Sequence, residues 1–289
     1  MNGPVRYSGV IDAAEAREFV PVMHQLIGCA FETIQPLFLS GTHVFTKNDT
    51  TPVTQADRSA EERMRRLIET RYPAHGVLGE EFGERVAQPG FPSYRWVLDP
   101  IDGTRAFISN CFLFGTLIAL ERDDGDGYAP LLGAIGFPAA GRALVGQRDG
   151  TRLYATDGSQ RTVRVRTCSR IEDATILATA HWSDSKPHGG ALVEGLTRRA
   201  RLYRTWGDCF GYFAIATGGA DVMLDPELAY WDVAAIVPVI EGAGGRATSW
   251  TGGNPLASPS LIATAGPLHE AVLNALGVER QAKTLNAQH

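Results

Sequence analysis

The run Arg95-Trp96-Val97-Leu98-Asp99-Pro100-Ile101-Asp102-Gly103-Thr104 places two carboxylates directly after a short apolar segment. The apolar residues predict a strand, and a turn at its end can aim Asp99 and Asp102 at one point. Mg²⁺ prefers oxygen ligands and commonly uses a few carboxylates together with water and phosphate, so this spacing suits it better than it suits zinc. Asp-Pro-x-Asp-Gly is also an ordinary turn sequence, and the run alone leaves both interpretations open.

The two residues after the second carboxylate suggest an anion site beside the metal site. We expect Gly103 and Thr104 to open a helix or turn whose free N–H groups can hold a phosphate oxygen. Metal and phosphate would then be neighbours.

Two further acidic positions bear on the choice between a metal site and an ordinary turn. Gly79-Glu80-Glu81 ends a short apolar segment, where adjacent acids usually form a solvent-facing loop. Asp232 stands at the start of an apolar helix predicted over 233–240, where an aspartate is first of all an N-cap. Taken singly, each residue has this simpler interpretation.

Length and composition indicate an ordinary globular enzyme. The 289 residues, with 44% hydrophobic and 20% charged residues, predict one compact unit with two packed halves. The net charge of −5 gives no basic surface for nucleic acid or an anionic membrane. The four cysteines form no CxxC pattern and predict buried free thiols in a reducing compartment. Without a signal-peptide pattern or a membrane-spanning apolar stretch, we expect a cytoplasmic protein with no membrane partner.

The first part of the chain predicts two helices followed by a sheet. Apolar residues recur at steps of three and four from residue 12 to 40, in a helix that Pro21 and Pro36 bend or bound, and a second amphipathic helix is predicted over 56–72. The short segments that follow predict a largely antiparallel sheet backed by both helices. They cover residues 76–79, 94–98, 114–121, 131–137, 143–147 and 163–166.

Beyond about Ser169 strands and helices alternate, which is typical of an α/β arrangement. Strands are predicted near 176–179, 202–204, 221–224 and 261–263, and helices near 190–199, 209–217, 233–242 and 268–276. We therefore divide the chain into residues 1–168, which carry most of the candidate ligands, and an α/β half, residues 169–289, which completes the site.

Four motifs in order resemble the signatures of the inositol monophosphatase superfamily. They are Lys47-Asn48-Asp49 with Pro52-Val53-Thr54-Gln55-Ala56-Asp57, Gly79-Glu80-Glu81, Trp96 to Thr104, and Trp231-Asp232-Val233-Ala234-Ala235. The resemblance covers nearly the whole chain. It implies an α/β (α+β) fold, the layered α-β-α-β-α sandwich of inositol monophosphatase and fructose-1,6-bisphosphatase, and it implies a homodimer.

The resemblance also implies a ligand set for metal ions. Glu80, Asp99 and the Ile101 carbonyl would bind one ion, and Asp99, Asp102 and Asp232 would bind a second. Glu80 would help to hold a further, weakly bound ion. Two or three Mg²⁺ ions per site are therefore implied.

The implied reaction is hydrolysis of a small phosphorylated metabolite without a covalent phosphoenzyme. By resemblance, Asp57 hydrogen-bonds Thr104, whose hydroxyl orients the attacking water, and Glu80 completes the catalytic set. Lys47 would add positive charge near the phosphate, although an exposed loop lysine is the commoner interpretation of such a residue.

Three stretches look similar to the histidinol-phosphate phosphatase branch of the superfamily. They are residues 102–108 leading to 114–120, residues 206–212 and residues 237–245. Arg105 replaces the threonine usual in inositol enzymes. The favoured activity is hydrolysis of L-histidinol phosphate to L-histidinol, a step of histidine biosynthesis.

Asp208 best separates the possible substrates, because a carboxylate at the head of the predicted helix could pair with a substrate ammonium or imidazole, or could simply cap that helix. Asp225 stands where the family usually places a glutamate that contacts the non-phosphate part of the substrate, with Glu227 as an alternative. The implied substrate contacts are Lys47, Ile101, Asp102, Gly103, Thr104, Arg105, Gly207, Asp208, Asp225 and Asp232.

Two alternatives stay open at this stage. One is an inositol-1-monophosphatase or another sugar or amino-alcohol monophosphatase. The other is a non-catalytic binding protein with the same fold, which the complete set of acidic ligand positions disfavours.

Overall fold

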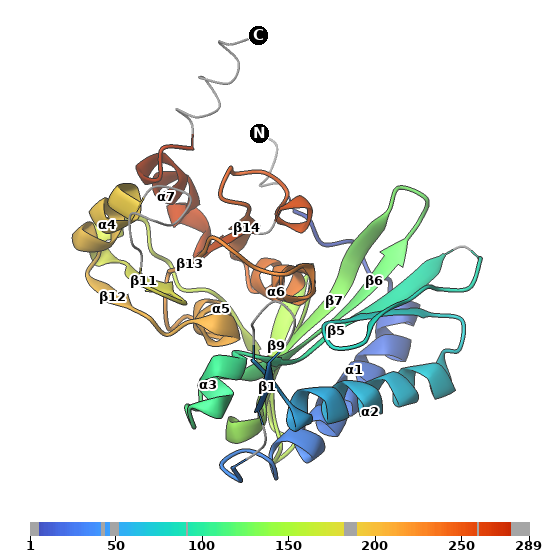
Figure 1. Ribbon diagram of the computed structural model, residues 1–289. Coiled ribbons are helices and arrows are strands. Elements are labelled where there is room, and N and C mark those ends of the chain that lie inside the picture. Colours follow the sequence, from blue (N-terminus) through green and yellow to red (C-terminus); the bar gives the residue numbers. More distant parts are fainter. Residues whose placement is uncertain are drawn as a thin grey trace.

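Helices and sheets alternate in layers through the molecule. A computed structural model describes residues 6–41, 44–46, 52–90, 92–181, 190–258 and 260–278. The outermost helices on one side are α1 (Ala13–Ile34) and α2 (Gln55–Arg71); α5 (Asp208–Ala216) and α6 (Tyr230–Gly242) lie between the two large sheets, and α4 (Gly190–Arg199) and α7 (His269–Ala275) cover the far side (Figure 1). The predicted layered α-β-α-β-α sandwich is confirmed.

The first large sheet lies between the outer helices and α6. Its strands are β3 (Gly76–Gly79), β4 (Gly83–Arg85), β5 (Ser93–Asp102), β6 (Gly115–Asp123), β7 (Tyr128–Phe137), β8 (Arg142–Gln147), β9 (Gly150–Ala155) and β10 (Gln160–Val163), in the order β10-β9-β8-β7-β6-β5-β3-β4. Neighbours run antiparallel except β3 and β5, which run parallel. The prediction of a largely antiparallel sheet is confirmed.

An irregularity in β5 creates the place where the two carboxylates lie. The ladder between β5 and β6 shifts its register between Asp99 and Asp102. Pro100 has no N–H to donate to that ladder, and its carbonyl accepts a hydrogen bond from the Thr116 hydroxyl at 2.8 Å. The predicted strand and the predicted turn are therefore one element with an irregular end.

The outer helices begin at the capping residues that their sequences offer. Asp12 caps α1 and exchanges hydrogen bonds with Glu15, and Thr54 caps α2 in the same way with Asp57. A short ribbon of β1 (Val44–Thr46) and β2 (Pro52–Thr54) precedes α2. The apolar pattern over 12–40 runs past the helix itself, but Pro36 bounds the helix as predicted: α1 ends at Ile34, because a proline lacks the N–H that would continue it.

The middle layer depends on close approach between α6 and the first sheet. Residues 232–241 of α6 are all buried. A Cβ at Gly133 would lie 2.0 Å from the Ala235 carbonyl oxygen, and a Cβ at Gly146 would lie 2.4 Å from Val239 Cα. These two glycines allow the helix backbone to lie directly on β7 and β8.

The second sheet has the order β12-β11-β13-β15-β14. Its strands are β11 (Thr175–Ala178), β12 (Leu202–Arg204), β13 (Val222–Asp225), β14 (Arg246–Thr248) and β15 (Leu261–Thr264). β11 runs parallel to β12 and β13, whereas β15 runs antiparallel to β13 and β14. The predicted alternation of strands and helices is confirmed, although β14 was not predicted.

Some local predictions are wrong. Of the strand expected over 163–166, only Val163 lies in a strand, at the end of β10, and residues 164–166 form none. The β9–β10 hairpin was not predicted, because its mostly polar, partly exposed residues give no clear apolar period. All four cysteines are free, but only Cys168 and Cys209 are fully buried, while Cys29 and Cys111 are half-buried. Among the described residues, no helix has the length and apolar character that a membrane crossing requires.

Candidate active site

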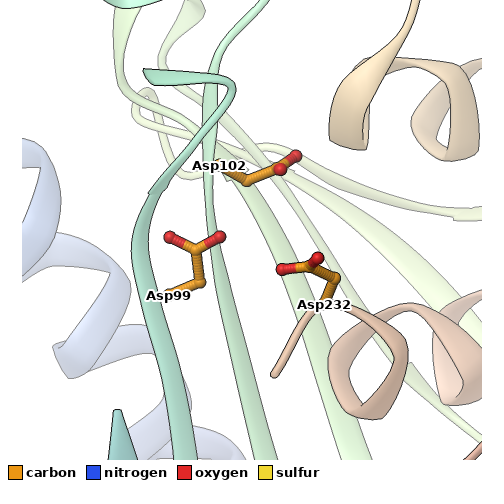
Figure 2. A group of neighbouring side chains, drawn as sticks. All are labelled: Asp99, Asp102 and Asp232. Atoms are coloured by element: carbon orange, nitrogen blue, oxygen red, sulfur yellow. The ribbon is translucent and has the colours of Figure 1, made fainter. Parts of the chain in front are cut away.

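Three carboxylates converge where the irregular end of β5 faces the start of α6. Figure 2 shows Asp99 and Asp102 on β5 and Asp232 opposite them on α6. One carboxylate oxygen from each lies within 4.8 Å of the others. Asp99 and Asp232 are buried, and Asp102 is half-buried.

Asp232 is not the N-cap that its position suggested, because Ala229 is the N-cap of α6 and Asp232 is the third helical residue. One of its oxygens accepts a hydrogen bond from the Ala229 N–H at 2.9 Å, which caps the first turn of α6. Its carboxylate also joins Asp99 and Asp102 in the cluster. Asp232 is therefore both a capping residue, bonded from within the first turn, and a member of the acidic cluster.

Burial and mutual repulsion raise the pKa values of these three acids. Burial is the main cause for all three, and repulsion between the negative charges adds to it. The pKa of Asp102 is raised to about 8 and that of Asp232 to about 7, while the pKa of Asp99 is raised well above its ordinary value. Such a cluster lacks a compensating positive charge among the described residues.

The chemistry of this cluster fits a divalent cation. Asp99 Oδ1 is buried and accepts no hydrogen bond within the described part of the chain. A buried carboxylate oxygen without a partner is costly unless a cation or another donor satisfies it. The neighbouring side chains of the cluster, Asp102 and Asp232, also offer carboxylate oxygens. Mg²⁺ favours such oxygen ligands.

Glu80 lies next to this cluster, in the turn that follows β3. Its backbone N–H donates to the Leu98 carbonyl at 3.1 Å, which fixes the turn beside the strand that carries Asp99. The charge of Glu80 and a hydrogen bond with it both raise the pKa of Asp99. The structure thus brings Glu80, the predicted fourth acid, to the cluster.

Asp57 and Thr104 meet at the other side of the β5 end. The Thr104 hydroxyl donates to the Ile101 carbonyl at 3.0 Å and lies 3.5 Å from Asp57 Oδ1. Thr54 holds the second oxygen of Asp57 through its N–H at 2.8 Å and through its hydroxyl. Burial raises the pKa of Asp57 to about 6.

Thr104 opens a short helix, as predicted. This helix, α3 (Thr104–Ile108), follows Gly103, whose φ of 78° lies in the left-handed region that favours glycine. A Cβ at Gly103 would also be tightly packed, since it would lie 3.0 Å from Asp208 Oδ2 and 3.2 Å from the Leu113 carbonyl oxygen. Arg105, one residue into α3, is exposed, and its charge lowers the pKa of Asp208.

A cavity of 520 Å³ opens beside the carboxylate cluster, with Asp102 and Asp232 on its wall. The remaining lining residues are Thr179, Ala180, His181, Asp208, Asp225, Pro226, Glu227, Leu228 and Ala229. Three of these lining residues, Asp208, Asp225 and Glu227, are acidic and lie outside the carboxylate cluster. Sequence reasoning gave no role to Thr179 or His181, because neither belongs to a motif.

Asp208 faces this cavity from the first turn of α5. The suggestion that it caps the helix is wrong, because Gly207 is the N-cap and Asp208 is the first helical residue. Asp208 has a φ of 49°, which a non-glycine residue rarely adopts. Its N–H donates to Thr179 Oγ1 at 3.0 Å, and Gly207 packs so closely that a Cβ would lie 2.2 Å from Thr179 Cα.

Asp225 lies at the end of β13 and is buried. It accepts a hydrogen bond from the Tyr212 hydroxyl at 2.7 Å, while burial raises its pKa to about 7. Glu227, the alternative contact, is exposed at the rim of the same cavity. Lys47 lies outside the described residues.

The model of the inositol monophosphatase family matches residues 15–281. The chain belongs to the inositol monophosphatase family. The resemblance drawn from the four motifs is thereby confirmed.

Relatives within the inositol monophosphatase family include histidinol-phosphatases. The chain is 40% identical over 209 residues to the histidinol-phosphatase of Chlorobaculum parvum, covering 72% of this chain and 76% of that protein. It is 34% identical over 232 residues to the histidinol-phosphatase of Mycobacterium tuberculosis, covering 80% and 86%. The solved inositol monophosphatase of Zymomonas mobilis superposes with a TM-score of 0.77 at 32% identity, covering 92% of this chain and all of that one.

These relatives are phosphatases, and the chain is accordingly a phosphoric monoester hydrolase. Members of the family are metal-dependent, typically with Mg²⁺, which agrees with the carboxylate cluster.

Proposed function

We propose that this enzyme hydrolyses L-histidinol phosphate to L-histidinol and phosphate with Mg²⁺ as its cofactor. The observation that carries the proposal is the acidic wall of the cavity beside the carboxylate cluster, formed by Asp208, Asp225 and Glu227. Acidic side chains opposite a phosphate site suit a substrate whose other end is cationic. The histidinol-phosphatase relatives support the same choice.

The residues that would hold Mg²⁺ are Glu80, Asp99, Asp102, Asp232 and the Ile101 carbonyl. When bound, the ions would neutralise phosphate charge and make water a better nucleophile at neutral pH. The unpartnered Asp99 Oδ1 supports this assignment.

Thr104 and Asp57 would orient the water that attacks phosphorus. The Thr104 hydroxyl lies between the Ile101 carbonyl and Asp57, at 3.0 Å and 3.5 Å. Once its single proton turns from the carbonyl to the Asp57 carboxylate, the hydroxyl can accept a hydrogen bond from water. With a pKa of about 6, Asp57 is mostly ionised at pH 7 and can take up the proton that the water loses. The new bond forms between the water oxygen and phosphorus as the bond to the alcohol oxygen breaks, and the alcohol oxygen takes up a proton as it leaves.

The phosphate would lie against Gly103 and Thr104, with the amino-alcohol part in the cavity. Asp208 lines the cavity next to Gly103, so its carboxylate is close to the phosphate end. A substrate ammonium there would offset the repulsion between Asp208 and Asp102, which together with burial raises the pKa of Asp208 to about 7. Tyr212 orients Asp225 as a second acceptor deeper in the fold.

A second candidate activity is hydrolysis of inositol 1-phosphate. The observation in its favour is the superposition with the Zymomonas mobilis inositol monophosphatase at 32% identity. The two substrates differ in charge, since inositol has hydroxyl groups where histidinol has an ammonium group and an imidazole.

Asp208→Asn separates these two candidates. We expect kcat/KM for L-histidinol phosphate to fall by at least about tenfold, because a partly buried charge pair is lost, and kcat/KM for inositol 1-phosphate to change less than about threefold. Asp126→Asn, at an exposed position between β6 and β7 and away from the cavity, is the control and should alter both values little. Equal losses on the two substrates would favour the inositol phosphatase.

A further inference from the structure

Glu61 is a buried carboxylate on α2 that no motif explains. It lies one helical turn after Asp57, so both side chains lie on the same face of the helix. Its relative exposure is 0%. A charge in such a position needs specific partners.

The partners of Glu61 belong to the turn that carries Glu80. Glu61 Oε2 accepts a hydrogen bond from the Glu81 N–H at 2.8 Å, and Oε1 accepts one from the Phe82 N–H at 3.2 Å. The preceding N–H, that of Glu80, donates to the Leu98 carbonyl at 3.1 Å. Three consecutive N–H groups are therefore fixed, one by β5 and two by Glu61.

The residue before this turn leaves room for the Glu61 carboxylate. A Cβ at Gly79 would lie 2.0 Å from Glu61 Oε1, so any larger residue would displace the carboxylate from the turn. Arg65, one turn further along α2, pairs with Glu61 Oε1 at 2.7 Å and donates to the Gly83 carbonyl on the far side of the hairpin. Glu61 and Arg65 together hold both ends of the turn.

We propose that Glu61 is a positioning residue that acts through Glu80, by holding the β3–β4 turn where the Glu80 carboxylate faces Asp99. One helix then serves both sides of the site, since α2 supplies Asp57 to Thr104 and Glu61 to the Glu80 turn. The inference rests on the proposed metal role of Glu80. It does not depend on which phosphate ester is hydrolysed.

Glu61→Gln tests this role through Mg²⁺ binding without substrate. Glutamine keeps one acceptor oxygen but directs an NH₂ group at a second N–H donor and gives up the charge opposite Arg65. We expect isothermal titration with Mg²⁺ to show about tenfold weaker binding, in the range known for residues that orient metal ligands. At saturating Mg²⁺, kcat should return to within about threefold of the parent value, because Glu61 does not touch the substrate.

Glu62→Gln is the matched control. Glu62 forms the same kind of pair with Arg66, four residues on in the same helix, but both side chains are exposed. Its substitution should leave Mg²⁺ binding unchanged. If Glu61→Gln yields no folded protein, Glu61→Asp carries the test, since it keeps the charge but shortens the reach and should also weaken Mg²⁺ binding.

Parental Mg²⁺ affinity in a folded Glu61 variant, even with a lower melting temperature, would overturn the positioning role. Absence of Mg²⁺ binding by the parent protein would overturn the metal assignment and this inference with it. A wrong substrate would leave the titration unaffected, so the two failures are distinguishable.

Discussion

The carboxylate of Asp208 lies over the α-carbon of Gly103, so closely that a Cβ at Gly103 would approach Asp208 Oδ2 to 3.0 Å. This contact joins the turn at the end of β5 to the head of α5, although the two are far apart in the sequence. It brings the proposed phosphate site and the proposed ammonium partner together.

Gly103→Ala should therefore impair catalysis and stability together. The φ of 78° penalises a side chain by about 1 kcal/mol, and the new methyl group would displace Asp208. We expect kcat/KM for L-histidinol phosphate to fall by about tenfold or more, because small displacements in an active site have large effects. Steady-state assays and thermal unfolding measure the two effects.

Gly158→Ala is the control for the backbone penalty. Gly158 has a φ of 83° but nothing within 4 Å of its added Cβ. The Gly158→Ala substitution should lower the melting temperature about as much as Gly103→Ala does, and it should leave kcat/KM unchanged. A Gly103→Ala enzyme with parental kcat/KM would contradict the contact with Asp208.

The acidic cluster predicts how stability depends on pH in the absence of metal. A carboxyl group whose pKa is raised on folding binds more protons folded than unfolded, so stability falls as pH rises between the two values. Asp102, at about 8, and Asp232, at about 7, act in this way. Burial lowers the pKa of His75 and His269 to about 4, so these two side chains make stability rise with pH. They do so only below about pH 6.5, the ordinary pKa of histidine.

The melting temperature in EDTA should therefore fall from pH 6.5 to pH 8, and the increase produced by Mg²⁺ should be larger at pH 8. Differential scanning calorimetry at several pH values, with and without MgCl₂, measures both trends. A melting temperature in EDTA that rises across this window would contradict the electrostatic description of the site.

Asp99→Asn should stabilise the metal-free enzyme while it abolishes activity. The amide cannot ionise, so the folded protein no longer bears the cost of either burying a charge beside other acids or keeping that carboxyl protonated, a gain on the order of 1–3 kcal/mol. Thermal unfolding in EDTA at pH 8 should show the gain, and Mg²⁺ should then raise the melting temperature little. Asp157→Asn, at an exposed position, should give neither effect. A less stable Asp99→Asn protein in EDTA would indicate that the cluster is not strained without metal.

The sequence predicted much of this fold because several elements have strong local signals. The apolar period of α1 and α2, and the short apolar strands such as β5 and β7, fix the type of each element. The β9–β10 hairpin was missed because its polar residues lack that period. The end of α1 at Ile34 agrees with Pro36 as a helix boundary, although the apolar pattern continues beyond it.

The site was predictable only where motifs carried it. Asp99 and Asp102 stand in one short run of sequence. The residues around Asp232 do not indicate that it faces this pair, because the packing of α6 on the sheet creates that proximity. The roles of Glu61 and Tyr212 could not be predicted, since each depends on a hydrogen bond across the fold, to the Glu80 turn and to Asp225.

The central claim is Mg²⁺-dependent hydrolysis with a preference for an amine-bearing phosphate ester. Steady-state phosphate release from L-histidinol phosphate and inositol 1-phosphate, each in MgCl₂ and in EDTA, tests it most directly. We predict that EDTA abolishes release, that Mg²⁺ restores it, and that kcat/KM is higher for L-histidinol phosphate by at least about tenfold. A preference for inositol 1-phosphate, or release that is unaffected by EDTA, would contradict the claim.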